Sequence, residues 1–386
     1  MRKLFYEDIN ITDFTATVTA CEPIDADKTY RVLLDATAFF PEEGGQSADK
    51  GTLGNQSVLD VQIEKDLIYH YVEKPLEVGT TVSGHVDWTQ RFDFMQQHSG
   101  EHIVSGLVHK HFGYNNVGFH LSVNEVTLDF NGELTPEQIA MIEKEANEVV
   151  FQNLPIEISY PSKEELEVLS YRSKIEIEGQ VRIITIPGVD VCACCAPHVA
   201  YTGSIGMIKI TNCQSHRGGV RLNILCGQRA LTDYNQKQNS VTAVSVALSA
   251  KPNLIADAVL RLKEENLRQK ERYNGLQAQY LKLSLSALPS PTQSNDAVLF
   301  VGPMDTIAIR NTVNELVESY TGYCAVFSGS ENDGYQFIVG SKHADCKELA
   351  QILRQELGAK CGGNTPMIQG SITATPDMIL NYLCSK

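Results

Sequence analysis

The stretch that decides the fold is residues 93–111, DFMQQHSGEHIVSGLVHKH, where the periodicity of the sequence changes. Within it Phe94, His98, His102 and Ser105 recur at intervals of three or four residues. That spacing is typical of one face of an α-helix. The segment is therefore predicted to be a helix that carries two histidines one turn apart on the same face.

Residues 1–90 have a different pattern, in which apolar and polar residues alternate in short runs. Examples are TATVTACEP, TYRVLLDATAFF and TVSGHVDW, and glycine, asparagine or aspartate separates successive runs. Alternation of this kind places one face of each strand in a core and the other in solvent, as in antiparallel sheets. We predict a small antiparallel β-barrel.

Residues 91–230 mix helices and strands. The segment FHLSVNEVTLDF (119–130) is predicted to be one strand. Thr135 is predicted to cap a helix that runs to about Phe151, because a proline occupies its first position. The segments VRIITI, GSIGMIKI and GVRLNILC are predicted to be further strands, with a cysteine cluster in the loop after the first.

A heptad repeat begins beyond Leu231. Seven of its nine positions are apolar, and the spacings alternate between four and three: Ile255, Val259, Leu262, Asn266, Gln269, Tyr273, Leu276, Tyr280 and Leu283. A long surface helix packed on the globular body explains this pattern. A coiled coil or a protruding helical hairpin explains it as well, with Asn266 fixing the register.

A Pro/Ser-rich linker follows and leads into a small α/β domain, in which CGGNT (361–365) is predicted to be a glycine-rich turn. We therefore expect an α+β protein of four parts. They are a β-barrel (1–90), a domain with the candidate metal site (91–230), a helical connector (231–290) and a C-terminal α/β domain (291–386).

The composition narrows the class of protein. The net charge of −15 argues against a generally basic coat for nucleic acid, although a local basic patch remains compatible with it. No apolar run approaches the roughly 18 residues that a membrane span needs, and the start, MRKLFYEDIN, has no apolar signal region. We expect a soluble, cytoplasmic protein without membrane contact, whose ten cysteines are reduced.

Two pairs of residues, each four positions apart, suggest a metal site. His98 and His102 lie on the predicted helix, and Cys194 and His198 lie in the loop CCAPH. Sulfur and imidazole ligands favour zinc over magnesium or calcium. Two histidines on an amphipathic helix are by themselves a weak signal, so the prediction of Zn²⁺ rests on both pairs together.

Some choices within this site stay open on the residues alone. Cys192 or Cys195 could replace Cys194, and such a cluster also suits metal-dependent redox sensing. The pattern HExxH of metalloproteases is absent, because position 99 is a serine. Glu101 could act as a general base, but a solvated helix residue is the simpler interpretation.

Five motifs in one order resemble a known family. They are LLDATAFFPEEGGQSADKG, QQHSGEHI, VGFHLSVNEVTLDF, VRIITIPGVDVCACCAPHVAYTGSIG and GVRLNILCGQRAL. Together they resemble the zinc-binding editing module of alanyl-tRNA synthetases and their free-standing relatives, the AlaX proteins, over roughly residues 5–232. The remainder resembles the long AlaX form, whose C-terminal domain is similar to that of alanyl-tRNA synthetases and DHH-type phosphoesterases.

This resemblance implies a trans-editing hydrolase that deacylates tRNA(Ala) mischarged with serine or glycine. By motif, His98, His102, Cys194 and His198 would bind Zn²⁺. Because little sequence precedes the barrel, we expect no ATP-dependent aminoacylation domain. A non-catalytic zinc protein that binds tRNA, and a zinc hydrolase of another aminoacyl ester or amide, are the alternatives.

The resemblance also implies residues of the amino-acid pocket. Thr37 and Gln46 match pocket positions, and a hydroxyl that bonds the serine side chain would discriminate against alanine. Gly44 and Gly45 would let the backbone approach the ligand. Arg182 is a candidate for orienting the terminal nucleotide.

Positive charge for tRNA is expected in residues 203–232, which contain no acidic residue. The positively charged residues of this segment are Lys209, Arg217, Arg221 and Arg229. Contacts between these side chains and phosphates would give an affinity that falls with salt. We also expect a homodimer, formed through residues 231–290 or through the C-terminal domain.

Overall fold

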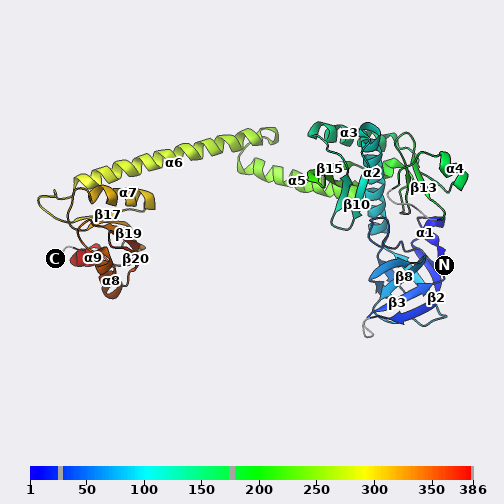
Figure 1. Ribbon diagram of the computed structural model, residues 1–386, viewed down its shortest axis with the longest axis horizontal. Coiled ribbons are helices and arrows are strands. Elements are labelled where there is room, and N and C mark those ends of the chain that lie inside the picture. The colour runs from blue at the N-terminus through cyan, green and yellow to red at the C-terminus, as the bar shows by residue number, and fades with distance from the viewer. Residues whose placement is uncertain (25–28, 174–178, 384–386) are drawn as a thin grey trace. The chain divides into compact units, whose positions relative to one another are not determined.

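The structure is a computed structural model of the 386-residue chain, and it describes residues 1–24, 29–173 and 179–383. The chain forms two compact units, Met1–Ala243 and Val244–Lys386, which are described separately below (Figure 1). Both units combine helices and sheets, so the predicted α+β class is confirmed. The finer division into four parts stays a prediction.

Seven antiparallel strands form a nearly closed barrel at the start of the first unit, as predicted (Figure 1). Their order in the sheet is β6 (Gln56–Val58), β5 (Gly51–Leu53), β9 (Thr81–Val86), β2 (Asp13–Pro23), β3 (Tyr30–Leu34), β8 (Leu67–Val72) and β7 (Asp60–Glu64). The same region contains helix α1 (Leu4–Glu7) and a short parallel pair of strands, β1 (Arg2–Lys3) and β4 (Ala36–Thr37). Phe14, Phe39 and Phe40 lie in its buried core.

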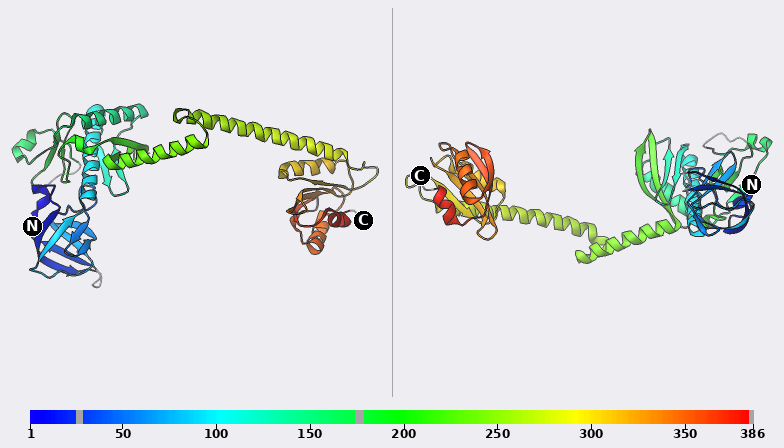
Figure 2. Two further views of the ribbon diagram at one scale, coloured as in Figure 1. Left: turned by 180° about the vertical axis from the view of Figure 1, so that it is seen from behind. Right: turned by 90° about the horizontal axis from the view of Figure 1, so that it is seen from below.

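Helix α2 (Trp88–Phe112) is the central element of the first unit and extends away from the barrel (Figures 1 and 2). It begins five residues before the predicted start, because the side chain of Asp87 accepts hydrogen bonds from the backbone of Thr89 and Gln90. It ends at Gly113, which takes the left-handed conformation that favours glycine. Nearly all its residues from Phe94 to Val108 are buried, so its histidines lie inside the protein.

Two further sheets surround this helix. One is antiparallel and has the strand order β10 (Asn116–Leu121), β11 (Val126–Phe130), β16 (Gly219–Cys226) and β15 (Ile208–His216). The other consists of β12 (Glu157–Ser159), β13 (Ile183–Ile186) and β14 (Asp190–Ala193). This region also contains the helices α3 (Pro136–Gln152), α4 (Lys163–Val168) and η1 (Thr202–Ile205). The predicted capping box of α3 is confirmed, since Thr135 and Gln138 exchange hydrogen bonds.

The prediction of one strand over residues 119–130 was wrong. The segment turns at Ser122–Glu125, where the backbone N–H of Ser122 donates to the carbonyl of Glu125. The apolar pattern continues through this turn because β10 and β11 both face the same core. Two short strands of a hairpin therefore gave the pattern of one long strand.

The second unit contains one long helix and a five-stranded sheet. Helix α5 (Gly227–Ala247) leads into this unit, and η2 (Pro252–Leu254) and α6 (Ile255–Ser286) follow. The sheet order is β17 (Ala297–Val301), β18 (Cys324–Ser330), β19 (Gly334–Gly340), β21 (Met367–Ile372) and β20 (Lys360–Asn364), with α7 (Thr306–Leu316), α8 (Cys346–Leu357) and α9 (Pro376–Leu383) alongside. The predicted turn at 361–365 was wrong: its first four residues pair with β21 as an edge strand.

Within the described residues, no single helix is both long and apolar enough to cross a membrane. In the part of the chain that the structure describes, one bent pair of helices, Gly227–Ala247 and Pro252–Ser286, reaches the length and composition of a span.

Candidate metal centre

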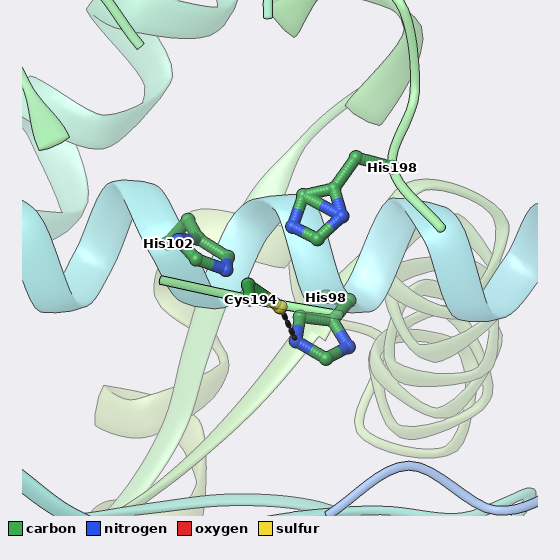
Figure 3. A group of neighbouring side chains, drawn as sticks. All are labelled: His98, His102, Cys194 and His198. Carbon is green, nitrogen blue, oxygen red and sulfur yellow. Dashed lines mark hydrogen bonds between the residues drawn. The ribbon is translucent and has the colours of Figure 1, made fainter. Parts of the chain in front are cut away.

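Helix α2 and the loop after β14 bring together the four residues predicted to bind metal. His98 and His102 point from one face of α2, and Cys194 and His198 approach them from the loop (Figure 3). One ligand atom from each of the four side chains lies within 4.8 Å of all the others. The Cys194 sulfur is 3.4 Å from Nε2 of His98. Three imidazoles and one thiol around a common centre form the kind of set that binds zinc.

Each imidazole of the cluster is held by an oxygen atom on its outer side. Nδ1 of His98 is 2.8 Å from Oε1 of Gln46, and Nδ1 of His102 is 2.8 Å from Oδ2 of Asp190. The third ring, His198, contacts the carbonyl of Ala196 through Nδ1 at 2.9 Å. An oxygen at Nδ1 keeps the proton there and leaves Nε2 as an electron-pair donor. The three Nε2 atoms are thus prepared to bind a metal ion.

An unpaired buried atom indicates independently that the cluster fits a cation. Nε2 of His198 is buried and has no hydrogen-bond partner among the described residues. A buried polar atom without a partner costs about 1–3 kcal/mol. A metal ion at the centre of the cluster would remove this cost, so the residues fit the ion that their chemistry suggests.

The electrostatics of the cluster leave Cys194 and His198 in the forms that can bind a metal. Burial raises the pKa of the Cys194 thiol, but the imidazoles of His98 and His102 outweigh burial and hold that pKa well below its usual value. Burial lowers the pKa of His198, and the neighbouring His102 and His98 lower it further. A thiolate and a neutral imidazole are the forms that bind metal.

The three neighbouring cysteines occupy different surroundings. Cys194 lies with all three histidines, whereas Cys192 lies with His102 and Asp190 only. Asp190 is already engaged, because the guanidinium of Arg172 donates to both its oxygens at 2.7 and 2.8 Å. Burial raises the pKa of the Cys195 thiol, and the nearby Cys194 raises it further. These differences favour Cys194 as the ligand, and the ligand assignment stays a prediction.

A cavity of about 390 Å³ opens beside the cluster. Its lining consists of the glycine-rich turn of the barrel, the metal-site residues and a few neighbours: Glu43, Gly44, Gly45, His98, Glu101, His102, Phe119, Ser173, Cys192, Ala193, Cys194 and Cys195. Gly45 has φ +82, and a Cβ there would overlap the carbonyl oxygen of Phe119. Only glycine fits this position, which brings the backbone of the turn to the cavity wall.

Glu101 is a buried residue of the cavity, so its interpretation as a solvated helix residue was wrong. It is 1% exposed. Its Oε1 accepts hydrogen bonds from Ser105 at 2.8 Å and from Asn116 at 2.6 Å, and its Oε2 lies 3.8 Å from Nε2 of His102. A carboxylate that hydrogen bonds hold in place beside the metal cluster is suited to proton transfer.

Comparisons with known proteins agree with this geometry. The family model described as tRNA synthetases class II (A) matches residues 2–90, and the model described as threonyl and alanyl tRNA synthetase second additional domain matches residues 181–222. The cattle alanyl-tRNA editing protein Aarsd1 is 30% identical over 296 residues, which cover 72% of this chain and 67% of that protein. The chain belongs to the alanyl-tRNA editing protein family.

Other relatives support this membership over almost the whole chain. The mouse alanyl-tRNA editing protein Aarsd1 is 28% identical over 390 residues, covering 97% of this chain and 94% of that protein. The alanine–tRNA ligase of Ignicoccus hospitalis is 28% identical over 377 residues, which are 94% of this chain and 40% of the ligase. The similarity thus covers both compact units.

The two residues predicted to form the amino-acid pocket, Thr37 and Gln46, are both fully buried. Thr37 donates to Nε2 of His70 at 2.7 Å and accepts from the backbone of Phe39 at 3.1 Å. Burial lowers the pKa of His70 to about 4, which keeps it a neutral acceptor. Gln46 is the outer partner of His98. Neither residue is among the described residues that line the cavity, and their roles stay predictions.

Arg182 braces the metal-binding loop. Its Nη1 donates to the carbonyls of Cys194 at 2.8 Å and Ala196 at 2.9 Å, and its guanidinium lies 5.4 Å from the centre of the Tyr6 ring. One of the two carbonyls belongs to Cys194, the cysteine that faces the histidines. Arg182 therefore holds the loop in place, whatever contact it makes with a nucleotide.

Three of the four cations expected to contact tRNA form ion pairs. Lys209 pairs with Glu143 at 2.6 Å, Arg221 with Asp129 at 2.7 Å, and Arg229 with Asp93 at 2.6 Å. Arg217 is exposed in the turn between β15 and β16, with φ +46. Because a paired cation attracts phosphate less strongly, these residues form a weaker basic patch than their number suggests.

Sequence reasoning missed two residues that support the metal cluster, Asp190 and Arg172. Asp190 accepts from His102 on one side and from Arg172 on the other. A carboxylate two positions before Cys192 was a usable signal for Asp190, because metal-binding histidines commonly donate to one. No signal in the sequence pointed to Arg172.

Proposed function

We propose that this protein is a zinc-dependent hydrolase that removes the wrong amino acid from mischarged tRNA(Ala). Ser-tRNA(Ala) is the proposed main substrate, with Gly-tRNA(Ala) as a second. The observation that carries the proposal is the His98, His102, Cys194 and His198 cluster beside a cavity, in a chain of the alanyl-tRNA editing family. The relatives of this chain are alanyl-tRNA editing proteins, which supports the choice of tRNA.

We assign the steps of the reaction to residues around the cavity. A bound zinc ion would supply Lewis acidity toward the ester or its water, or would anchor the terminal adenosine. Glu101, fixed by Ser105 and Asn116, would accept a proton from the attacking water. Gly44 and Gly45 would let the ester approach the barrel turn.

Discrimination between amino acids is proposed to involve Thr37 and Gln46. The Thr37 hydroxyl donates to His70 and accepts from the backbone N–H of Phe39, so its oxygen has one lone pair left to accept a further hydrogen bond. A serine hydroxyl offers such a donor and an alanine methyl group does not. Gln46 would act through its hydrogen bond to His98.

The tRNA body is proposed to contact Lys209, Arg217, Arg221 and Arg229, with Arg182 near the terminal nucleotide. We further propose that the protein is cytoplasmic, since a reducing compartment keeps the three neighbouring cysteines as thiols. A homodimer through residues 231–290 or the C-terminal domain completes the proposal.

The test is deacylation of four substrates by the purified protein: Ser-tRNA(Ala), Gly-tRNA(Ala), Ala-tRNA(Ala) and Ser-tRNA(Ser). We expect rapid loss of serine and slower loss of glycine from tRNA(Ala), with alanine and Ser-tRNA(Ser) retained. Salt-sensitive binding of tRNA(Ala) without turnover of any ester would instead establish a non-catalytic binding protein. Hydrolysis of small aminoacyl esters without tRNA binding would establish a different hydrolase.

A further inference from the structure

A buried ion pair joins the barrel region to helix α2. The guanidinium of Arg91 donates to both carboxylate oxygens of Asp49 through Nε at 3.0 Å, and to one of them through Nη2 as well. Both side chains are only 1% exposed, and no other arginine–carboxylate pair of the described residues is so deeply buried. Because the cost of burying two charges largely offsets their attraction, such a pair is weak evidence for stability. Its contacts indicate a role in fixing geometry.

The ion pair holds both ends of one loop, residues 38–49, here called the clamped loop. At its start, the carbonyl of Ala38 accepts a hydrogen bond from Nη2 of Arg91 at 2.6 Å. At its end, the carboxylate of Asp49 accepts from the backbone N–H of Phe40 at 2.6 Å, and the backbone N–H of Asp49 donates to the carbonyl of Phe40 at 3.0 Å. The same two side chains therefore fix where the loop leaves the barrel and where it returns.

The middle of the clamped loop belongs to the candidate site. Gly44 and Gly45 line the cavity, and Oε1 of Gln46 is 2.8 Å from Nδ1 of His98. Gln46 is fully buried, and its Nε2 has no hydrogen-bond partner among the described residues. Since the amide group is held on one side only, the position of Gln46 depends on the backbone of the loop that carries it.

Helix α2 carries both the anchor of the clamped loop and part of the metal cluster. Arg91 and His98 are seven residues apart in this helix, so they lie on one face, about 10.5 Å apart along its axis. The backbone hydrogen bonds of the helix keep this spacing constant. The loop is therefore anchored to the same rigid element that presents the histidine contacted by Gln46.

We propose that Asp49 and Arg91 are positioning residues of this site, which hold the clamped loop so that Gln46 orients His98 and the glycine turn shapes the cavity. Neither Asp49 nor Arg91 is among the described residues that line the cavity, so both act through the loop. The effect on deacylation rests on the proposed function. The order of the loop and the hold on His98 are measurable without any tRNA.

Two variants of the full chain separate positioning from stability. The double variant Asp49→Val with Arg91→Met replaces the pair by apolar side chains of similar size, a change that is often neutral for stability, and it removes the hydrogen bonds to the loop backbone. Arg91→Lys keeps a charge beside Asp49 but lacks the planar fork that reaches Asp49 and the loop carbonyl together. The control is Glu22→Gln with Arg31→Gln, which removes another arginine–carboxylate pair of the barrel.

Hydrogen exchange and zinc affinity test the proposal without a substrate, at temperatures where each variant is folded. In the double variant we expect faster exchange of the amides in residues 38–49, with strand β3 (Tyr30–Leu34) unchanged. We also expect about tenfold weaker binding of Zn²⁺ in competition with a chelator, because Gln46 no longer holds His98. Arg91→Lys should give intermediate values and the control pair wild-type values. Unchanged exchange and zinc affinity in both variants, or faster exchange shared equally with β3, would overturn the proposal.

Deacylation of Ser-tRNA(Ala) gives the third measurement. A displacement of about 1 Å near the reacting groups can lower a rate about 100-fold. We therefore expect the double variant, saturated with Zn²⁺, to lose about 100-fold in kcat while KM stays nearly unchanged. A wild-type kcat in this variant would overturn the positioning role. If the wild type hydrolyses no aminoacyl-tRNA, the proposed function fails, and exchange and zinc affinity alone decide whether the ion pair positions the loop.

Discussion

At the scale of single residues, the position of Glu101 matters most for chemistry. Its carboxylate is buried between Ser105, Asn116 and His102, inside the wall of the cavity. Glu101→Gln keeps the size of the side chain and removes the base. We expect deacylation of Ser-tRNA(Ala) to fall about 10²–10⁴-fold, with zinc content and tRNA affinity unchanged. Glu133→Gln, at an exposed glutamate, is the control, and near-wild-type activity of Glu101→Gln would exclude the base role.

Asp190 accepts hydrogen bonds from His102 and Arg172, so we expect it to support a metal bound by His102. Loss of its charge in Asp190→Asn should weaken the hold on the His102 ring and lower zinc affinity about 10–100-fold. Competition with a chromogenic chelator measures this affinity. Asp60→Asn, on the barrel strand β7, is the control. An unchanged zinc affinity in Asp190→Asn would mean that His102 does not bind the metal.

His70 gives the barrel a pH-dependent stability. Burial lowers its pKa from 6.5 to about 4 in the folded protein, so the unfolded chain binds the proton more strongly. The stabilisation is complete above pH 6.5 and is lost as the pH falls toward 4, by at most about 3 kcal/mol. His70→Gln should lack this loss. The measurement is the free energy of unfolding of both proteins at pH 7, 5.5 and 4.5, and parallel curves would contradict the assignment.

At the scale of elements, the turn at Gly44 and Gly45 joins the barrel to β10. Gly45 has φ +82 and no room for a Cβ beside Phe119, whereas Gly54 has φ +61 and open space around it. Gly45→Ala should therefore destabilise the protein by about 1–3 kcal/mol more than Gly54→Ala, and should displace the cavity wall and reduce deacylation. Thermal unfolding and activity of the two variants provide the measurement. Equal behaviour would show that the turn does not shape the cavity.

Much of this architecture was predictable from local patterns. Alternation in residues 1–90 predicted the barrel, and the four-residue spacing of His98 and His102 and of Cys194 and His198 predicted which side chains would meet. Other contacts join residues that are distant in the sequence. Thr37 meets His70 within the barrel, and Asp190 meets Arg172 from a separate segment. Such pairings depend on the register of strands that no local pattern specifies, and sequence reasoning missed them.

At the scale of the whole molecule, the metal cluster belongs to one unit only. The four side chains of the cluster all lie in Met1–Ala243, while Val244–Lys386 has its own sheet and core. Removal of zinc with a chelator should lower the unfolding temperature of the first unit and leave that of the second unchanged, because binding stabilises only the unit that holds the ion. Calorimetry with and without added zinc tests this. A shift of both transitions, or of neither, would contradict it.

The central claim is that the four-residue cluster supports deacylation of mischarged tRNA(Ala). Its most direct test measures the single-turnover rate of serine release from Ser-tRNA(Ala), together with bound zinc, for the wild type, Cys194→Ala and the control Cys213→Ala on strand β15. We predict that Cys194→Ala loses both zinc and serine release, whereas Cys213→Ala and the wild type keep both. Serine release at the wild-type rate from a Cys194→Ala protein without zinc would contradict the account.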